Sequence, residues 1–152
     1  VVPNSPEATA AIELAIRKAT KKPTGKLTKA DLEKVTSLEV SNRKITDLKP
    51  LAGLQNVGYL NLSWNQITDM RPLAGMEKLD YIAISHNKIT DLNGLGGLKR
   101  LWDLRIQNNQ IPDLSPLMEL PRLKILRLNG NPITDLSTFA SVKNLMVNSS
   151  SP

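Results

Sequence analysis

The stretch LNLSWNQITDMRPLAGMEKLDY, residues 60–81, sets the pattern for most of this chain. Blocks of the same 22-residue length follow one another without insertion or deletion. Each block keeps the form L-x-L-x-x-N-x-I-T-D-L-x-P-L-x-x-L-x-x-L-x-x with few substitutions. Apolar columns that stay in step over successive blocks indicate a repeat architecture, in which each block forms one coil of a solenoid. The blocks begin at Leu38, Leu60, Ile82, Leu104 and Leu126.

The first and third residues of every block alternate like a short strand that buries one face. Leu60 and Leu62 occupy these positions in the quoted block, and Ile67 and Leu73 then return the chain to the same core. Because no coil can bury its apolar edge alone, neighbouring coils supply the core for one another. The spacing therefore predicts a sheet of short strands along one side of the solenoid and turns along the other.

Two polar columns repeat inside this apolar frame, and we interpret both as structural. The asparagines are predicted to bond the backbone of their own turn and of the next coil, because a buried amide needs hydrogen-bond partners. The aspartates are predicted to accept from backbone N–H groups in turns. One carboxylate per coil falls short of the roughly six to eight oxygens that calcium prefers, so we expect no metal and no cofactor. The columns are Asn65, Asn87, Asn109 and Asn131, and Asp47, Asp69, Asp91, Asp113 and Asp135.

The residues before the first block read as two helices. Ser5 followed by proline is typical of a helix start, and we expect Pro23 and Gly25 to end that helix. Thr28 with Asp31 has the spacing of a capping box, which predicts the start of a second helix. These residues are therefore predicted to cover the first coil.

We divide the single domain into a helical amino-terminal cap at residues 1–37, five repeats at 38–147 and a disordered tail at 148–152. A sixth strand is predicted to include Leu145 and Val147, and no cap is recognisable after it. An uncovered last coil leaves apolar surface and a strand edge without a partner. We therefore expect that the native protein continues or that a partner covers this end, self-association through the last coil being one such arrangement.

Composition supports a globular domain without catalytic machinery. The 152 residues are 40% hydrophobic and 22% charged, which is ordinary globular usage and argues against disorder and membrane spanning. The chain has no cysteine, one histidine, no glycine-rich phosphate loop and no carboxylate pair outside the repeated columns. We therefore predict that it is not an enzyme.

Half of the net charge of +6 falls in the predicted cap, where seven basic residues stand against four acidic ones. Such a basic face is either simply solvated or attracts an anionic polymer, for example in a cell envelope. Nucleic acid is a disfavoured partner because no nucleic-acid-binding motif accompanies the charge. The basic residues are Arg17, Lys18, Lys21, Lys22, Lys26, Lys29 and Lys34.

The repeats, preceded by the cap sequence LTKADLEKVTSLEV at residues 27–40, resemble the bacterial internalin-type leucine-rich-repeat family. The resemblance extends over about residues 5–147. It implies an α/β fold, a right-handed solenoid with short parallel strands on the concave face, 3₁₀ or short helical turns on the convex face and a helical amino-terminal cap. Gly94 and Thr138 depart from the family pattern, because proline stands at this position in the other blocks, and this puts the local convex geometry in doubt.

The same resemblance implies a protein that is secreted or held at the bacterial cell surface and binds other proteins without catalysis. The alternative is an intracellular scaffold or regulatory subunit, like the eukaryotic phosphatase-regulatory members of the same 22-residue class, with a cytoplasmic location.

Recognition of a partner must depend on positions at which the blocks differ, and these are the outward-facing strand positions. Neighbouring strands lie about 4.8 Å apart, so Tyr59 and Tyr81 are expected side by side, as are Trp64 and His86. Small residues such as Ala83 stand between these pairs and are also expected to face outward. This predicts a shallow trough with aromatic walls, and exposed tyrosine and tryptophan are enriched at interface hot spots.

Charged residues continue this face in the next coils. Arg105 and Arg127 are adjacent in their column, where like charges are mildly destabilising unless an anion approaches, and Asp103 is close enough to neutralise one of them. The alternatives are that these positions vary without function and that His86 is an ordinary polar surface group. We predict that a protein or peptide ligand contacts Tyr59, Trp64, Tyr81, His86, Trp102, Asp103, Arg105, Ile125 and Arg127.

Overall fold

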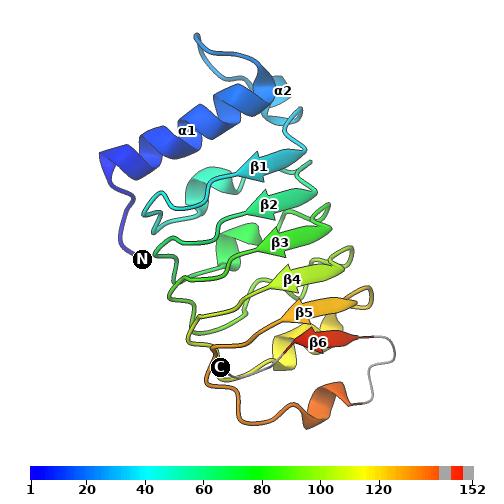
Figure 1. Ribbon diagram of the computed structural model, residues 1–152. Coiled ribbons are helices and arrows are strands. Elements are labelled where there is room, and N and C mark those ends of the chain that lie inside the picture. Colours follow the sequence, from blue (N-terminus) through cyan, green and yellow to red (C-terminus); the bar gives the residue numbers. More distant parts are fainter. Residues whose placement is uncertain (141–144, 149–152) are drawn as a thin grey trace.

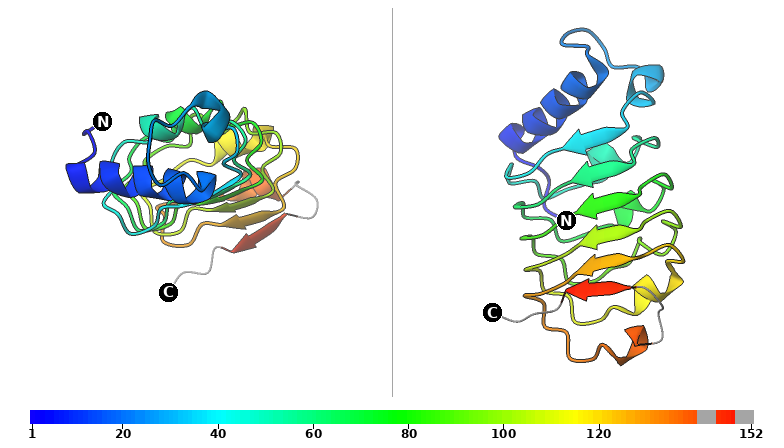
Figure 2. Two further views of the ribbon diagram at one scale, coloured as in Figure 1. Left: turned by 90° about the horizontal axis from the view of Figure 1, so that it is seen from above. Right: turned by 45° about the vertical axis from the view of Figure 1, so that its right-hand side comes forward.

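The computed structural model of the chain describes residues 1–140 and 145–148. Six short parallel strands form one sheet whose spatial order is their chain order, so each coil lies beside the next one (Figure 1). Viewed from above, the chain winds through successive coils, with the strands along one side and the 3₁₀ turns along the other (Figure 2). The predicted leucine-rich-repeat solenoid is therefore confirmed. The strands are β1 (Ser37–Glu39), β2 (Tyr59–Asn61), β3 (Tyr81–Ala83), β4 (Asp103–Arg105), β5 (Ile125–Arg127) and β6 (Met146–Asn148).

Asn148 lies at the end of β6, although we had placed it in the tail; the rest of the predicted tail, residues 149–152, lies outside the described residues. The pairing register explains why the sequence pattern was so regular. Leu38 pairs with Leu60, and Leu60 pairs with Ile82, so identical block positions stand beside each other on neighbouring strands.

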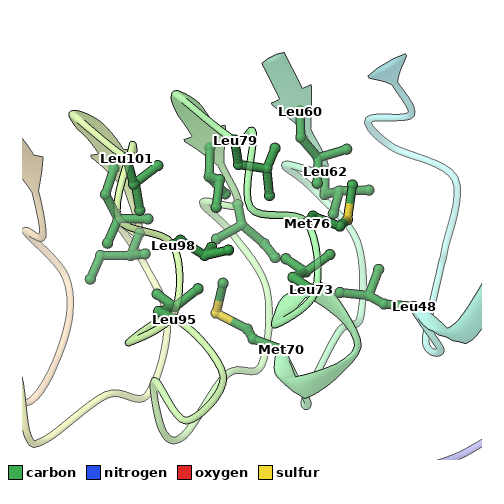
Figure 3. Packing of buried hydrophobic residues seen from close by; sticks show 14 of the residues in the cluster. Leu48, Leu60, Leu62, Met70, Leu73, Met76, Leu79, Leu95, Leu98 and Leu101 are labelled. Atoms are coloured by element: carbon green, nitrogen blue, oxygen red, sulfur yellow. The ribbon is translucent and has the colours of Figure 1, made fainter. Parts of the chain in front are cut away.

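The core is a continuous apolar column that follows the blocks. Leu60, Leu62, Ile67 and Leu73 all have no exposed surface, as the pattern predicts. Figure 3 shows leucine and methionine side chains from neighbouring coils packed against each other inside the solenoid. Each Å² of apolar surface that is removed from water stabilises the fold by about 25 cal/mol. This burial is the main force that holds the coils together.

Most of the turns opposite the sheet have proline at their start. Proline fixes φ near −65°, which suits the start of a 3₁₀ turn. The third coil has Gly94 at this position with φ +99°, and no 3₁₀ helix is assigned there within the described residues. Thr138, the other departure, still allows a 3₁₀ helix. The 3₁₀ helices are η1 (Lys49–Leu51), η2 (Arg71–Leu73), η3 (Ser115–Glu119) and η4 (Ser137–Phe139).

The asparagine column bonds the backbone of its own turn, as predicted, and the backbone of the preceding coil rather than of the next one. The Asn87 side-chain oxygen accepts from Ile67 N–H at 2.9 Å, and its amide donates to the carbonyls of Leu62 and Ile84, both at 3.0 Å. Asn65, Asn109 and Asn131 make equivalent bonds. Each aspartate of the second column accepts from the backbone N–H two residues later, at 2.7–3.0 Å. Both columns are therefore structural.

The cap begins with helix α1 (Pro6–Thr20), where the Ser5 hydroxyl accepts from Ala8 N–H as predicted. The helix ends earlier than expected, because Lys21 adopts a left-handed conformation with φ 55° before Pro23 is reached. The N–H groups of Lys21 and Lys22 then donate to the carbonyls of Lys18 and Arg17, which is a common helix ending. Helix α2 (Lys29–Leu32) starts with the predicted capping box between Thr28 and Asp31.

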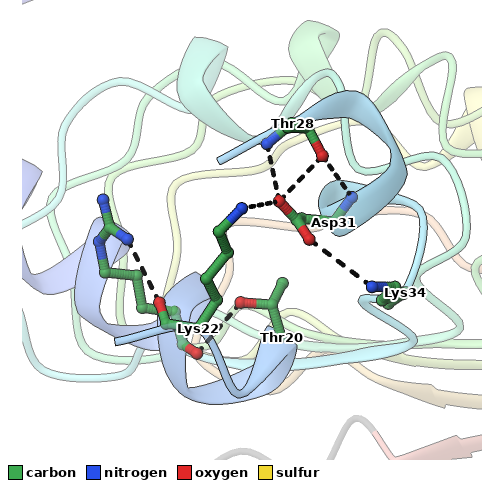
Figure 4. A network of polar contacts seen from close by, with 6 residues as sticks. Thr20, Lys22, Thr28, Asp31 and Lys34 are labelled. Carbon is green, nitrogen blue, oxygen red and sulfur yellow. Dashed lines mark hydrogen bonds and ion pairs between the residues drawn. The ribbon is translucent and has the colours of Figure 1, made fainter. Parts of the chain in front are cut away.

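Asp31 joins the two helices of the cap (Figure 4). Its carboxylate accepts from Lys22 Nζ at 2.7 Å and from the N–H and hydroxyl of Thr28, both at 2.9 Å, and Lys34 Nζ lies 3.6 Å away. The hydrogen bond from Lys22, followed by those from Thr28, holds the pKa of Asp31 far below its ordinary value. Part of the positive charge of the cap is therefore paired with an acidic residue of the cap itself.

Candidate functional site

Tyr59 and Tyr81 form the first aromatic pair of the predicted trough. The β2–β3 register places them side by side, with ring centroids 4.6 Å apart and planes 6° from parallel. The Arg105 guanidinium lies over the Tyr81 ring, 5.0 Å from its centroid, and extends the stack by one strand. Burial raises the pKa of the Tyr81 phenol, with Arg105 opposing the shift, so Tyr81 presents a neutral hydroxyl group at physiological pH.

Two positions expected to face a ligand are instead buried. Asp103 is 2% exposed and Ala83 is 5% exposed. In each case a short side chain stands between longer ones on the adjacent strands: Tyr81 and Ile125 flank Asp103 in the sheet register. Asp103 binds Arg105 through two hydrogen bonds, at 3.1 and 3.3 Å, and this pairing raises the pKa of Arg105. The Asp103 carboxylate is therefore occupied by Arg105, whose guanidinium it holds in place.

Trp64 and His86 form the second aromatic pair. Their ring centroids lie 3.6 Å apart with 8° between the planes, and the side-chain amide of Asn108 stands 3.2 Å from His86 Nε2. Their backbone is held from strand to strand, since Trp64 N–H donates to Ser85 and His86 N–H donates to Gln107, both at 2.9 Å. The predicted adjacency of these aromatic residues is confirmed.

The column that contains Trp64 and His86 has a backbone conformation that sequence reasoning missed. All its members have a positive φ, a region that glycine and asparagine adopt with little cost and bulky residues rarely enter. The left-handed conformation costs other residues about 1–2 kcal/mol each. The sequence did contain a signal of this conformation, because the other blocks have asparagine or glycine at this position, and these residues adopt positive φ readily. The column is Asn42 (φ 55°), Trp64 (φ 61°), His86 (φ 56°), Asn108 (φ 53°) and Gly130 (φ 75°).

Polar side chains form fixed contacts between the two aromatic pairs. The Asn61 amide donates to Glu39 at 2.8 Å, and the Ser85 hydroxyl donates to Gln107 at 2.6 Å. These bonds cross from one strand to the next, so the polar groups on this face have set directions. The sequence columns contained these residues but did not indicate their pairing.

The remaining predicted residues lie at the edge of this surface. Arg127 is exposed and makes no ion pair within residues 1–140 and 145–148, in contrast to Arg105. Trp102 is 43% exposed and directly precedes β4. Neither stacked pair includes its ring. Ile125 is half-buried beside Asp103 in the register. Nowhere in the described part of the chain do three acidic, histidine or cysteine side chains gather as they would around a metal ion.

Comparison with known proteins agrees with the repeat geometry. Models of leucine-rich repeats match residues 99–141 and 53–69. Internalin C2 of Listeria monocytogenes superposes with a TM-score of 0.68 at 28% identity, covering 92% of both chains. Internalin F of the same organism superposes with a TM-score of 0.80 at 33% identity, over 91% of this chain. This chain is a leucine-rich-repeat protein structurally close to the internalins.

The chain spans only 42% of the internalin F chain, so the likeness concerns the repeat domain. The functional domain of InlJ from Listeria monocytogenes matches with a TM-score of 0.67 at 20% identity and supports the fold alone. No curated protein sequence matches the chain. Internalin-type repeat domains are non-catalytic protein-binding modules, which agrees with the prediction that the chain is not an enzyme. Among the described helices, none has the length and apolar character needed to cross a membrane.

Proposed function

We propose that this internalin-like domain binds a protein or peptide ligand on the concave face of its sheet, and that it acts outside the bacterial cell or on its surface. The observation that carries the proposal is the Trp64–His86 pair. Trp64 is 59% exposed, so its ring adds little to the core, and its backbone conformation is unfavourable for a bulky residue. Residues held in unfavourable conformations cluster at functional sites.

The ligand contacts in this proposal follow the exposed groups. Tyr59, Tyr81 and Trp64 are the apolar anchors, because aromatic side chains dominate interface hot spots. His86 is their polar neighbour. Arg127 is the group that meets an acidic side chain on the ligand, since Arg105 is already bound by Asp103.

Two other functions have less support. Binding of an anionic envelope polymer needs free cations on the cap, but Arg17 pairs with Glu13 at 2.8 Å, and Lys22 and Lys34 pair with Asp31. An intracellular scaffold would use the same concave face in another compartment. Fractionation of the source cell, with detection of the chain by antibody, distinguishes an exported protein from an intracellular one.

The test of the concave site compares affinities for a partner captured with the wild-type domain. We expect Trp64→Ala to weaken binding by roughly 2 kcal/mol or more, about thirtyfold, and to change stability by less than about 0.5 kcal/mol. Met118→Ala is the matched control, because Met118 is also a large exposed apolar residue, 46% exposed, but lies in the 3₁₀ turn η3 away from the sheet. Equal affinity of Trp64→Ala and wild type would refute the proposed site.

A further inference from the structure

A groove of about 950 Å³ runs between helix α1 and strand β1, at the end of the sheet where the cap meets the repeats. Figure 1 shows α1 beyond β1, across the first edge of the sheet. One wall of the groove comes from Ala11, Leu14 and Ala15 of α1, and the other comes from Ser37 and Glu39 of β1. The groove adjoins the aromatic pairs, since its lining residue Ser37 pairs with Tyr59 in the β1–β2 register and its lining residue Asn42 precedes Trp64 in the left-handed column.

The β1 wall offers backbone hydrogen-bonding groups. β1 is the first strand of the sheet and pairs only with β2 within the described residues. Val40 N–H donates to Asn61, and Thr36 accepts from Tyr59, so the even-numbered residues of this segment direct their backbone groups toward β2. In a strand the alternate residues direct theirs to the opposite side. The N–H and C=O groups of Ser37 and Glu39 therefore point toward the groove and can pair with another extended chain.

The α1 wall offers an apolar surface that the fold uses only in part, since Ala15 packs against the core whereas Leu14 is exposed. The helix packs on the core through Ala8, Ile12 and Ile16. The side chains facing the groove form a second stripe of small apolar residues next to Leu14, which is 69% exposed. Alanine side chains leave room beside the helix, and an exposed leucine above them provides apolar contact for a side chain of the bound segment.

The charges around the groove favour an acidic occupant. Lys18, Arg43 and Lys44 line it, against Glu7 and Glu39, which leaves one positive charge in excess. The Glu39 carboxylate is already bonded by Asn61, and hydrogen bonds from the backbone of Glu7 and from Ser5, with a smaller contribution from the Lys44 charge, lower the pKa of the Glu7 carboxyl. Neither Lys18 nor Arg43 enters an ion pair anywhere in residues 1–140 and 145–148. They are therefore available to a bound acidic side chain.

We propose that this groove binds an extended segment of a partner protein, which adds as a strand to β1, places an apolar side chain against Leu14 and directs an acidic side chain to Lys18 or Arg43. Strand addition at an exposed sheet edge is a general mode of peptide recognition, in which the backbone supplies affinity and side-chain pockets supply specificity. The proposal is independent of the concave-face ligand.

Selection from a displayed library of random twelve-residue peptides tests the proposal. The library is first depleted on the Leu14→Asp variant and then selected on the wild-type domain, so that only peptides that need the groove are retained. We expect enriched peptides with alternating apolar positions and an acidic residue. Because Leu14 is exposed, Leu14→Asp should keep the wild-type unfolding midpoint while binding these peptides at least about tenfold more weakly.

Three further variants identify the contact. Ser37→Pro removes one outward N–H without removing a bond to β2 and should also weaken binding about tenfold or more. Met118→Asp, at an exposed site in the 3₁₀ turn η3, should bind the peptides as wild type does, and Trp64→Ala tests whether the peptides reach the concave face instead. The proposal is overturned if no peptide is enriched after depletion, or if Ser37→Pro binds the enriched peptides with unchanged affinity. A loss caused by Trp64→Ala would move these peptides to the concave face and would equally overturn it.

Discussion

The indole ring of Trp64 stacks on the imidazole ring of His86 with centroids 3.6 Å apart, and both residues have a left-handed backbone. These two observations distinguish what the fold requires at this position from what ligand binding would require. The fold needs a residue that tolerates positive φ, and Asn42, Asn108 and Gly130 supply it elsewhere in the column. The aromatic side chains add an exposed surface that the fold does not need.

Replacing Trp64 with glycine and with alanine separates the backbone cost from the ring contacts. Both variants lose the stack on His86, but only glycine adopts φ near 61° freely. We expect Trp64→Gly to be more stable than Trp64→Ala by about 1 kcal/mol, measured by urea unfolding. If the Trp64→Ala variant is as stable as Trp64→Gly or more stable, the left-handed conformation carries no cost at this position.

Removing a member of the asparagine column should lower the free energy of unfolding, because the backbone groups that it bonds stay buried. Asn87→Ala leaves Ile67 N–H without its partner, whereas the Leu62 carbonyl loses one of two amide donors and still accepts from Asn65. Because a buried unsatisfied group costs about 1–3 kcal/mol, we expect a loss of about 1–3 kcal/mol in the free energy of unfolding. Asn131→Ala, at a half-buried member of the column, should cost less. Equal losses would mean that burial does not set the cost.

A cavity in the repeat core should be as costly as in other close-packed interiors. Ile89 has no exposed surface, so Ile89→Ala should lower the free energy of unfolding by about 2–5 kcal/mol. Met118→Ala, on the exposed convex side, should change it by less than about 0.5 kcal/mol. An Ile89→Ala loss below about 0.5 kcal/mol would contradict the core assignment.

The cap should lose stability in acid through Asp31. Because its folded-state pKa is depressed below the ordinary 3.8, ionised Asp31 stabilises the fold above about pH 4, and this contribution is lost as pH falls through the lowered pKa. We expect the difference in urea midpoint between wild type and Asp31→Asn to be largest at about pH 7 and to shrink toward about pH 2. Glu33→Gln, at a surface carboxylate 4.0 Å from Lys29, should show little of this dependence. A difference independent of pH would exclude the ionised form as the cause.

If the cap binds anionic polymers, the cations outside its internal network should be responsible. Lys22 is unsuitable for this test because its ammonium group bonds Asp31. Replacing Lys18, Lys21 and Lys26 with serine should preserve the unfolding midpoint and weaken binding to heparin, and the loss should shrink as salt is added, because exposed charges are screened over about 8 Å at physiological ionic strength. Binding that does not respond to salt would remove the electrostatic explanation.

The fold was predictable from the sequence because it depends on short-range regularity. Each block repeats the same positions, so the stacking of Leu60 on Ile82 and the bonding role of Asn87 follow from spacing alone. The aromatic pairs were predictable for the same reason. The burial of Asp103 was not, because it depends on the size of its neighbours and on the direction in which Arg105 folds back. The groove beside β1 was not either, because it depends on how a helix outside the repeat packs on the first coil.

Every ladder asparagine bonds the backbone of the coil before its own, so a coil needs only that its successor carry the same residue. If residues 60–81 were deleted, Asn87 would stand where Asn65 stood and could close the turn around Ile45 with the same bonds. Whole coils can thus be duplicated or lost in evolution without new packing having to be found. Each such event moves the ligand-contacting side chains apart or together by one strand spacing, about 4.8 Å. The length of the binding surface can therefore be matched to partners of different length in steps of one coil.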